Sequence, residues 1–247
     1  MAKTSLTSEI ENAENVAETI STNDIVATND ELVATSTASA AGISGDIDSE
    51  DIKFPLVQIV SGMGKLSDVE GLSKGDLVLD GEYKLNQPAS ITVIRLAKLY
   101  EENLPWGTDE IPRLVNSKAE VLELGGTLGW ESGTGGERIP PTWKPMADAL
   151  ICIACDDEKS TYFPFEHGDK KFAFARWKLR NTAYFSAATD IISAAGTYYR
   201  AGLTTGTFEL TTEKRAFKTG NTTYVPMIKK GETNAPEFKE WLSEFSA

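Results

Sequence analysis

The segment Lys170-Lys-Phe-Ala-Phe-Ala-Arg-Trp-Lys-Leu-Arg-Asn181 is the part of the chain from which its fold class is most directly inferred. Residues 170–176 alternate in side-chain type with a period of two, which is typical of a β-strand. Over residues 178–199, apolar side chains instead recur every three or four positions, which is typical of a helix. The sequence therefore predicts a strand that leads almost directly into a long helix.

Strand patterns flank this segment on both sides. β-Branched and apolar residues concentrate in five earlier runs, at residues 51–60, 76–80, 90–100, 148–155 and 160–165. After the helix, residues 208–212 and 224–228 form a predicted hairpin, and an amphipathic helix at 235–245 closes the chain. This order predicts a mainly β (α+β) protein, a partly open, OB-like β-barrel with one embedded helix and a C-terminal helix.

Composition divides the chain into three parts. Residues 1–50 hold ten acids, one base and no aromatic residue, so they are predicted to be a disordered acidic tail. Residues 51–230 form the predicted β-rich, OB-like core, in which the Gly- and Pro-rich loop 125–145 is either a functional loop or an insertion with two short strands. Residues 231–247 contain four acids and three aromatic residues and form an acidic aromatic C-terminal helix or tail.

Charge is distributed very unevenly along the chain. The formal net charge is −13, yet residues 159–230 carry twelve Lys and Arg against five Asp and Glu. The same residues hold thirteen of the 22 Phe, Tyr and Trp residues. Cations interleaved with rings are typical of proteins that bind single-stranded nucleic acid, in which cations contact phosphates and rings stack on bases.

The predicted strand 170–176 places Lys170, Phe172, Phe174 and Arg176 on one face. Two interpretations of this face are open. In the first, the two Phe rings stack on bases and the two cations contact phosphates. In the second, the rings belong to the hydrophobic core and the cations extend from the strand ends into solvent.

Trp177, Lys178 and Arg180 follow, at the predicted N-terminus of the helix. Cations at that end oppose the helix macrodipole, so a bound polyanion would stabilise them. The free amides of the first helical turn would also bind phosphate. The alternative is that Lys178 and Arg180 are ordinary surface cations of a helix that begins a few residues later.

A second group of candidate cations, Lys214, Arg215 and Lys218, lies near the tip of the predicted hairpin. These residues either hold a phosphate backbone or only keep the strand ends soluble. The C-terminal tail either docks replication or recombination proteins, mimics a polyanion over a basic groove, or packs its rings on the barrel. Single-stranded nucleic acid is the expected partner, with such proteins binding through the acidic tails.

No catalytic residue, metal ligand or cofactor is predicted. Cys152 and Cys155 form a C-x-x-C pair, but a buried strand there would direct the two sulfurs to opposite faces. His167 is the only histidine and precedes a glycine at a predicted turn. No signal sequence and no apolar run of about 20 residues occurs, so a cytoplasmic protein that does not enter the membrane is expected.

Three further groups of residues point to a family. They are Asp51-Ile-Lys-Phe-Pro-Leu-Val-Gln-Ile-Val60 with Gly75-Asp76, Thr182-Ala-Tyr184, and Phe208-Glu-Leu-Thr-Thr212 with Tyr224-Val-Pro226. Over about residues 51–230, the chain resembles tailed-bacteriophage proteins of the single-stranded-DNA-binding and replication-accessory type. The resemblance implies a non-enzymatic role in phage DNA replication or recombination, in the host cytoplasm. The alternatives are a virion or protein-interaction protein with an acidic tail, and an enzyme that depends on His167.

Overall fold

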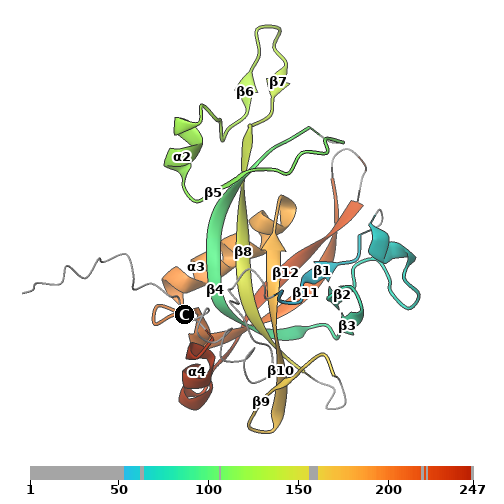
Figure 1. The fold of residues 1–247 in the computed structure, drawn as a ribbon, viewed down its shortest axis with the longest axis vertical. Helices are drawn as coiled ribbons and strands as arrows, with labels where there is room; N and C mark the ends of the chain where they lie inside the picture. The colour runs from blue at the N-terminus through green and yellow to red at the C-terminus, as the bar shows by residue number, and fades with distance from the viewer. Residues whose placement is uncertain are drawn as a thin grey trace, which may run out of the picture.

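The computed structural model describes residues 53–61, 64–105, 107–155, 161–217, 220 and 222–245. Within these residues the fold is mainly β, as the sequence predicts, and its sheets do not close into a barrel. Figure 1 shows long central strands crossed by one helix, with an arm that extends from one end. The predicted acidic tail, residues 1–50, lies outside the described residues.

The main sheet is antiparallel throughout and has its centre at three long strands. Its members are β4 (Ala89–Glu102), β5 (Leu114–Val115), β8 (Trp143–Ala154), β9 (Phe165–His167), β10 (Lys170–Leu179), β11 (Gly206–Ala216) and β12 (Thr222–Thr233). They follow the order β12-β11-β4-β8-β10-β9, and β5 pairs with the far end of β4. Strand β8 therefore lies between β4 and β10 and pairs with both along most of its length.

Alternation along β10 defines an inner and an outer face of the main sheet. Trp177 and Leu179 point inward and pack on a helix that begins as one π-helical turn, η2 (Tyr184–Ala188), and continues as α3 (Thr189–Thr197). Phe172 and Phe174 point outward, where α4 (Pro236–Ser243) packs on them through Leu242. A short 3-10 turn, η3 (Leu203–Thr205), joins α3 to β11.

A small antiparallel sheet lies beside the main sheet. It consists of β1 (Val57–Ile59), β2 (Leu77–Leu79) and β3 (Tyr83–Leu85), with the 3-10 turn η1 (Lys65–Asp68) between β1 and β2. One parallel bridge, Leu56 with Arg176, connects it to β10. On its other side, the Thr212 hydroxyl of β11 donates a 2.6 Å hydrogen bond to the Gly75 carbonyl. The small sheet is thereby fixed between β10 and the β11–β12 hairpin.

The arm is formed by residues 103–142. It contains β5, α2 (Lys118–Glu123) and a two-stranded sheet of β6 (Glu131–Ser132) and β7 (Arg138–Ile139). Ser117 is the N-cap of helix α2, because its Oγ accepts from the Glu120 amide at 3.1 Å, and it also donates to the Glu120 carboxylate at 2.8 Å. The stretch 125–145 is thus the predicted insertion with two short strands, although β8 already begins at Trp143.

The predicted start of the long helix at residue 178 is wrong. Strand β10 continues to Leu179, because Trp177 and Leu179 keep the period of two and fill the inner core. Asn181 then has a φ of +50°, a left-handed conformation that ends the strand. The helix begins at Thr182, and the Asn181 carbonyl accepts from the Phe185 amide at 3.4 Å. Lys178 therefore belongs to a strand, and Arg180 lies in the turn directly before the helix.

The other predicted elements are mostly present with shifted ends. The runs 51–60 and 76–80 contain β1 and β2, the run 90–100 lies within β4, the run 148–155 overlaps the second half of β8, and the hairpin is β11–β12. The predicted strand 160–165 is wrong, since the described residues 161–164 are a turn and a short irregular segment, and β9 begins at Phe165. The C-terminal helix is confirmed as α4, whose rings pack on the sheet.

Candidate functional site

A row of cations lies on the outer face along β10 and just after its end. We call Arg176, Lys178 and Arg180 the cation row. They alternate with Trp177 and Leu179, whose side chains point into the inner core, and all three cations are exposed. Because side chains two positions apart on a strand are about 7 Å apart, the row is about 14 Å long.

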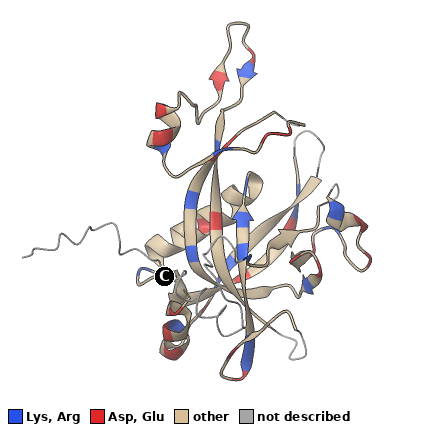
Figure 2. Ribbon diagram, viewed as in Figure 1, with Lys and Arg blue, Asp and Glu red and all other residues tan. Residues whose placement is uncertain are grey.

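Neighbouring strands add charges to the same face. Arg95 on β4 and Lys144 on β8 contribute two further cations, and Asp148 and Glu101 contribute two carboxylates. Arg95 has a further interaction of its own, so the other four cations are set against the two carboxylates, which leaves two surplus positive charges on this part of the outer face. Figure 2 shows basic segments on neighbouring strands with an acidic segment between them.

Both carboxylates form ion pairs with the cation row. Arg176 contacts Asp148 through two hydrogen bonds, of which the one from Nε to Oδ1 measures 3.3 Å. Arg180 Nη2 lies 2.7 Å from Glu101 Oε1. The two guanidinium side chains are each 48% exposed, so each pair contributes only about 0.2–1 kcal/mol of stability. Within the described residues, Lys178 has no carboxylate partner.

The two Phe residues of the predicted binding strand are buried. Phe172 is 6% exposed and Phe174 is 3% exposed, and α4 covers both. The Phe174 ring lies 4.2 Å from Phe245, centroid to centroid, and 5.6 Å from Trp241. The interpretation that assigns these rings to the core is therefore the one that the structure bears out. The partly exposed rings of the outer face belong to α4 and its end, and Phe238 and Trp241 among them lie toward the β9 end of β10, where both contact His167.

A groove of about 560 Å³ lies along the edge of β10 that is not paired with β8. It runs between β1, the end of β10 with the turn that follows, and β12, and its lining includes Lys178, Arg180, Asn181 and Tyr224. Beyond the Leu56 bridge, no described residues of β1 and β10 are paired, and β12 is the last strand of the main sheet. The groove therefore follows strand edges, and it shares two cations with the cation row.

The hairpin cations lie on different faces. Lys214 is opposite Tyr224 in the β11–β12 ladder and so lies on the groove side. Arg215 is one position further on and points to the other face, where it donates to Met227 Sδ at 3.4 Å. Lys218 lies outside the described residues. One of the two described hairpin cations is thus near the groove.

Two other predicted residues lie away from the cation row. Lys170 is at the opposite end of β10, beside the turn to β9. Trp177 is only 3% exposed and belongs to the inner core. The structure therefore brings Arg176, Lys178 and Arg180 together on one face and separates Lys170 and Trp177 from them.

Sequence reasoning missed several residues of this site. They are Arg95, Glu101, Lys144, Asp148, Tyr224, Phe238 and Trp241. Alternation carried no signal for Arg95 or Asp148. Strict alternation puts Arg95 on the side of Ile91 and Val93, and only the bulge between Val93 and Arg95 turns it outward. Asp148 shares its side of the strand with the buried Leu150 and Cys152. Only tertiary structure brings the α4 rings and Tyr224 beside β10.

The cysteines and the histidine considered in the sequence lie apart from one another in the described part of the chain. Cys152 is buried on the outer face, where desolvation raises the pKa of its thiol far above the usual value, and Cys155 packs toward the inner core. His167 packs on the rings of Phe238 and Trp241, at centroid distances of 5.4 and 5.2 Å. No group of three His, Cys, Asp or Glu residues is placed to hold a metal ion within the described residues.

Comparisons with protein-family models, with curated proteins and with solved structures found no match to this chain. Among the described residues, none of the helices has the length and apolar character needed to cross a bilayer. The function of the chain therefore has to be argued from the geometry and charge of the outer face and the groove.

Proposed function

We propose that this chain is a non-enzymatic protein that binds single-stranded nucleic acid through its outer face. The observation that carries the proposal is the cation row, Arg176, Lys178 and Arg180, within a part of the outer face that has two surplus positive charges. Lysine and arginine side chains about 7 Å apart along a strand form a track that an extended phosphate backbone follows. The two arginines are held by weak, exposed ion pairs, so phosphates replace the carboxylates at little cost.

Rings on the same face, further back along β10 toward β9, favour a single strand over a duplex. Phe238 and Trp241 are partly exposed and lie next to the buried Phe172 and Phe174. Stacking on such rings requires bases whose faces are free, and bases have free faces in single strands. Phosphate neutralisation by the row and stacking on the α4 rings are the two contributions that we propose.

We also propose an OB-like, partly open barrel for the core. The small sheet contacts β10 through the Leu56 bridge and β11 through Thr212, so it lies in the gap between the two ends of the main sheet. The helix η2–α3 packs on the inner face below it. A strongly curved antiparallel arrangement with one embedded helix is the plan of OB-folds, which bind oligonucleotides.

The biological setting that we propose is phage DNA replication or recombination in the cytoplasm of the host. It rests on the sequence resemblance over about residues 51–230 and on the charge pattern of the chain. The acidic segments at the two ends are the proposed docking sites for other replication or recombination proteins.

Fluorescence anisotropy with a labelled oligo-dT of about 30 nucleotides tests the proposed binding. We expect binding at 50 mM salt that weakens steadily as salt is raised, because phosphate contacts release counterions. An oligo-dA strand and a duplex of the same length establish whether free base faces are needed. Absence of binding at low salt, or binding that salt does not change, would show that the proposal is wrong.

The arm favours a second candidate, a virion or protein-interaction role. It exposes several large apolar side chains, including Ile111, which is 90% exposed, and Leu122, Leu124 and Trp130, which are 53–59% exposed. Exposed apolar groups of this kind mark protein-binding surfaces. Mass spectrometry with copy-number measurement on purified phage particles distinguishes the two roles, because a virion component must co-purify with the particle.

A further inference from the structure

The groove beside β10 is next to the cation row but does not belong to the outer face. We propose that it takes a nucleobase of the bound strand, with the Tyr224 ring as the stacking partner. This inference rests on the proposed single-strand binding and deepens it by assigning a base-binding subsite. Its volume of about 560 Å³ falls in the range of about 300–1,000 Å³ that is typical of small-molecule sites.

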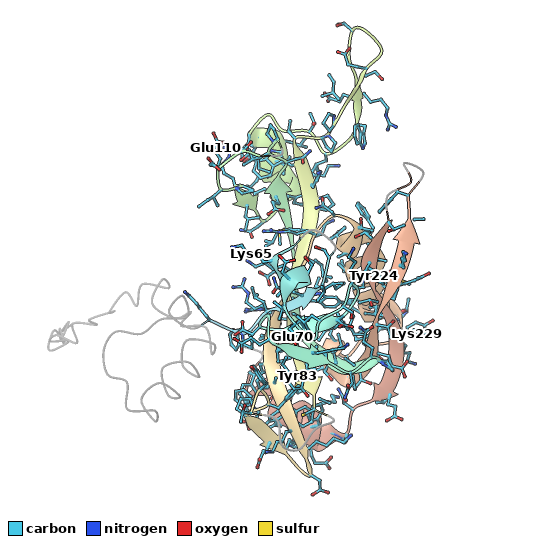
Figure 3. All side chains as sticks on the ribbon, turned by 90° about the vertical axis from the view of Figure 1, so that its right-hand side faces the viewer. Lys65, Glu70, Tyr83, Glu110, Tyr224 and Lys229 are labelled. Carbon is cyan, nitrogen blue, oxygen red and sulfur yellow. The ribbon has the colours of Figure 1, made fainter. Side chains whose placement is uncertain are left out.

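The Tyr224 ring is held in a fixed position. It packs directly on the backbone of Gly75, where an added Cβ would lie only 2.4 Å from Tyr224 Cδ1. Gly75 has a φ of +94°, so both its conformation and the space around it require glycine. Figure 3 shows Tyr224 at the boundary between the small sheet and β12. A ring that is already fixed loses little entropy when a base stacks on it.

Polar groups at the groove match the edges of a nucleobase. Asn181, Gln58 and Thr182 belong to its lining, and the first two are exposed. Within the described residues, neither the Asn181 amide nor the Gln58 amide makes a side-chain hydrogen bond to the protein. Amide side chains offer both donors and acceptors, as the edges of bases do. The groove therefore has hydrogen-bonding capacity that the fold itself leaves unused.

Two cations connect the groove to the cation row. Lys178 and Arg180 belong both to the cation row and to the lining of the groove. A phosphate bound at this rim leaves the attached base beside the groove, and Lys214 lies across the ladder from Tyr224 on the same side. A strand that follows β10 from α4 thus reaches the groove at the end of the row.

An oligonucleotide without bases distinguishes base binding from phosphate binding. Anisotropy is measured with a 30-nucleotide dT strand and with an abasic strand of the same length and charge. We expect dT to bind about 5- to 100-fold more tightly than the abasic strand, which is the range for stacking of a base on one aromatic ring. Tyr224→Leu should reduce this ratio, whereas Tyr224→Phe, which keeps the ring, should preserve it. Tyr198→Leu, which removes a ring 66% exposed on another face, is the matched control.

A photo-crosslink in the unmodified protein provides a second measurement in case Tyr224→Leu does not fold. Strands with one 5-iodouracil at successive positions are irradiated, and the crosslinked peptide is identified by mass spectrometry. A crosslink at Tyr224 supports the groove subsite. A dT-to-abasic ratio that Tyr224→Leu leaves unchanged, or crosslinks that never include Tyr224, would overturn the subsite and leave the proposed function standing. Absence of binding to both strands would overturn both.

Discussion

The ion pair between Arg176 and Asp148 makes an unusual prediction: removing an acid should strengthen the proposed binding. In the structure, Asp148 is only 14% exposed and holds the Arg176 guanidinium on the outer face. Asp148→Asn keeps the size of the side chain and removes its charge, so Arg176 becomes available for a phosphate. Lys178→Ala is the opposite change, because it removes a cation that has no carboxylate partner within the described residues.

The charges of the outer face determine how much Asp148→Asn and Lys178→Ala should change the salt dependence of binding. Two surplus positive charges correspond to about two neutralised phosphates, and each phosphate contributes about −0.7 to the slope of log K against log salt for a single strand. We therefore expect a slope of about −1.4 for the unmodified protein, about −2.1 for Asp148→Asn and about −0.7 for Lys178→Ala. A slope of about −1.4 corresponds to an affinity that falls about 7-fold between 50 and 200 mM salt.

Anisotropy titrations of labelled oligo-dT at five salt concentrations give the three slopes. Lys229→Ala is the matched control, because Lys229 is an exposed lysine on β12 that lies opposite Glu209 and away from the cation row. Its slope should equal that of the unmodified protein. The reasoning fails if Asp148→Asn weakens binding at low salt while its melting temperature is unchanged, or if Lys229→Ala changes the slope as much as Lys178→Ala does.

Two predictions concern the outer face beneath α4. Leu242 is the one fully buried side chain of α4, so Leu242→Ala should cost about 2–5 kcal/mol in urea unfolding, whereas the exposed Glu240→Ala should change stability by less than about 0.5 kcal/mol. An equal effect of both substitutions would contradict the packing described for α4. Burial raises the pKa of the Cys152 thiol, so it stays protonated and unreactive at pH 8, and a disulfide reagent should modify Cys152 only after denaturation. Rapid modification of Cys152 in the native protein would show that the outer face opens.

Local periodicity was sufficient to predict most of the fold. The alternation of residues 170–176 and the three- and four-residue steps after Tyr184 are both present in the structure as β10 and η2–α3. The boundary between them was missed because Trp177 and Leu179 are apolar in a period that suits the end of a strand as well as the start of a helix. Only the core beneath β10 decides between the two, and that core is formed by residues distant in sequence.

The candidate site was less predictable from the sequence, because it depends on contacts between segments that are distant in sequence. Whether Phe172 and Phe174 are exposed depends on α4, which lies more than 60 residues further along the chain. The pairing of Arg176 with Asp148 depends on the register between β8 and β10, which no local pattern encodes. Alternation nevertheless placed Arg176 on the same face as the two Phe residues, and that part of the prediction is confirmed.

The net charge of −13 and the basic outer face act at different distances. At physiological salt, interactions between exposed charges are largely screened beyond about 8 Å, which is shorter than the cation row of about 14 Å. A phosphate in contact with Lys178 therefore experiences mainly the surplus charge of its own face. The acidic remainder of the chain reduces long-range attraction, so it slows the approach of a strand more than it weakens the bound state. A chain that is acidic overall is thus compatible with a phosphate-binding face, provided that the contacts are short and local, as those of the cation row are.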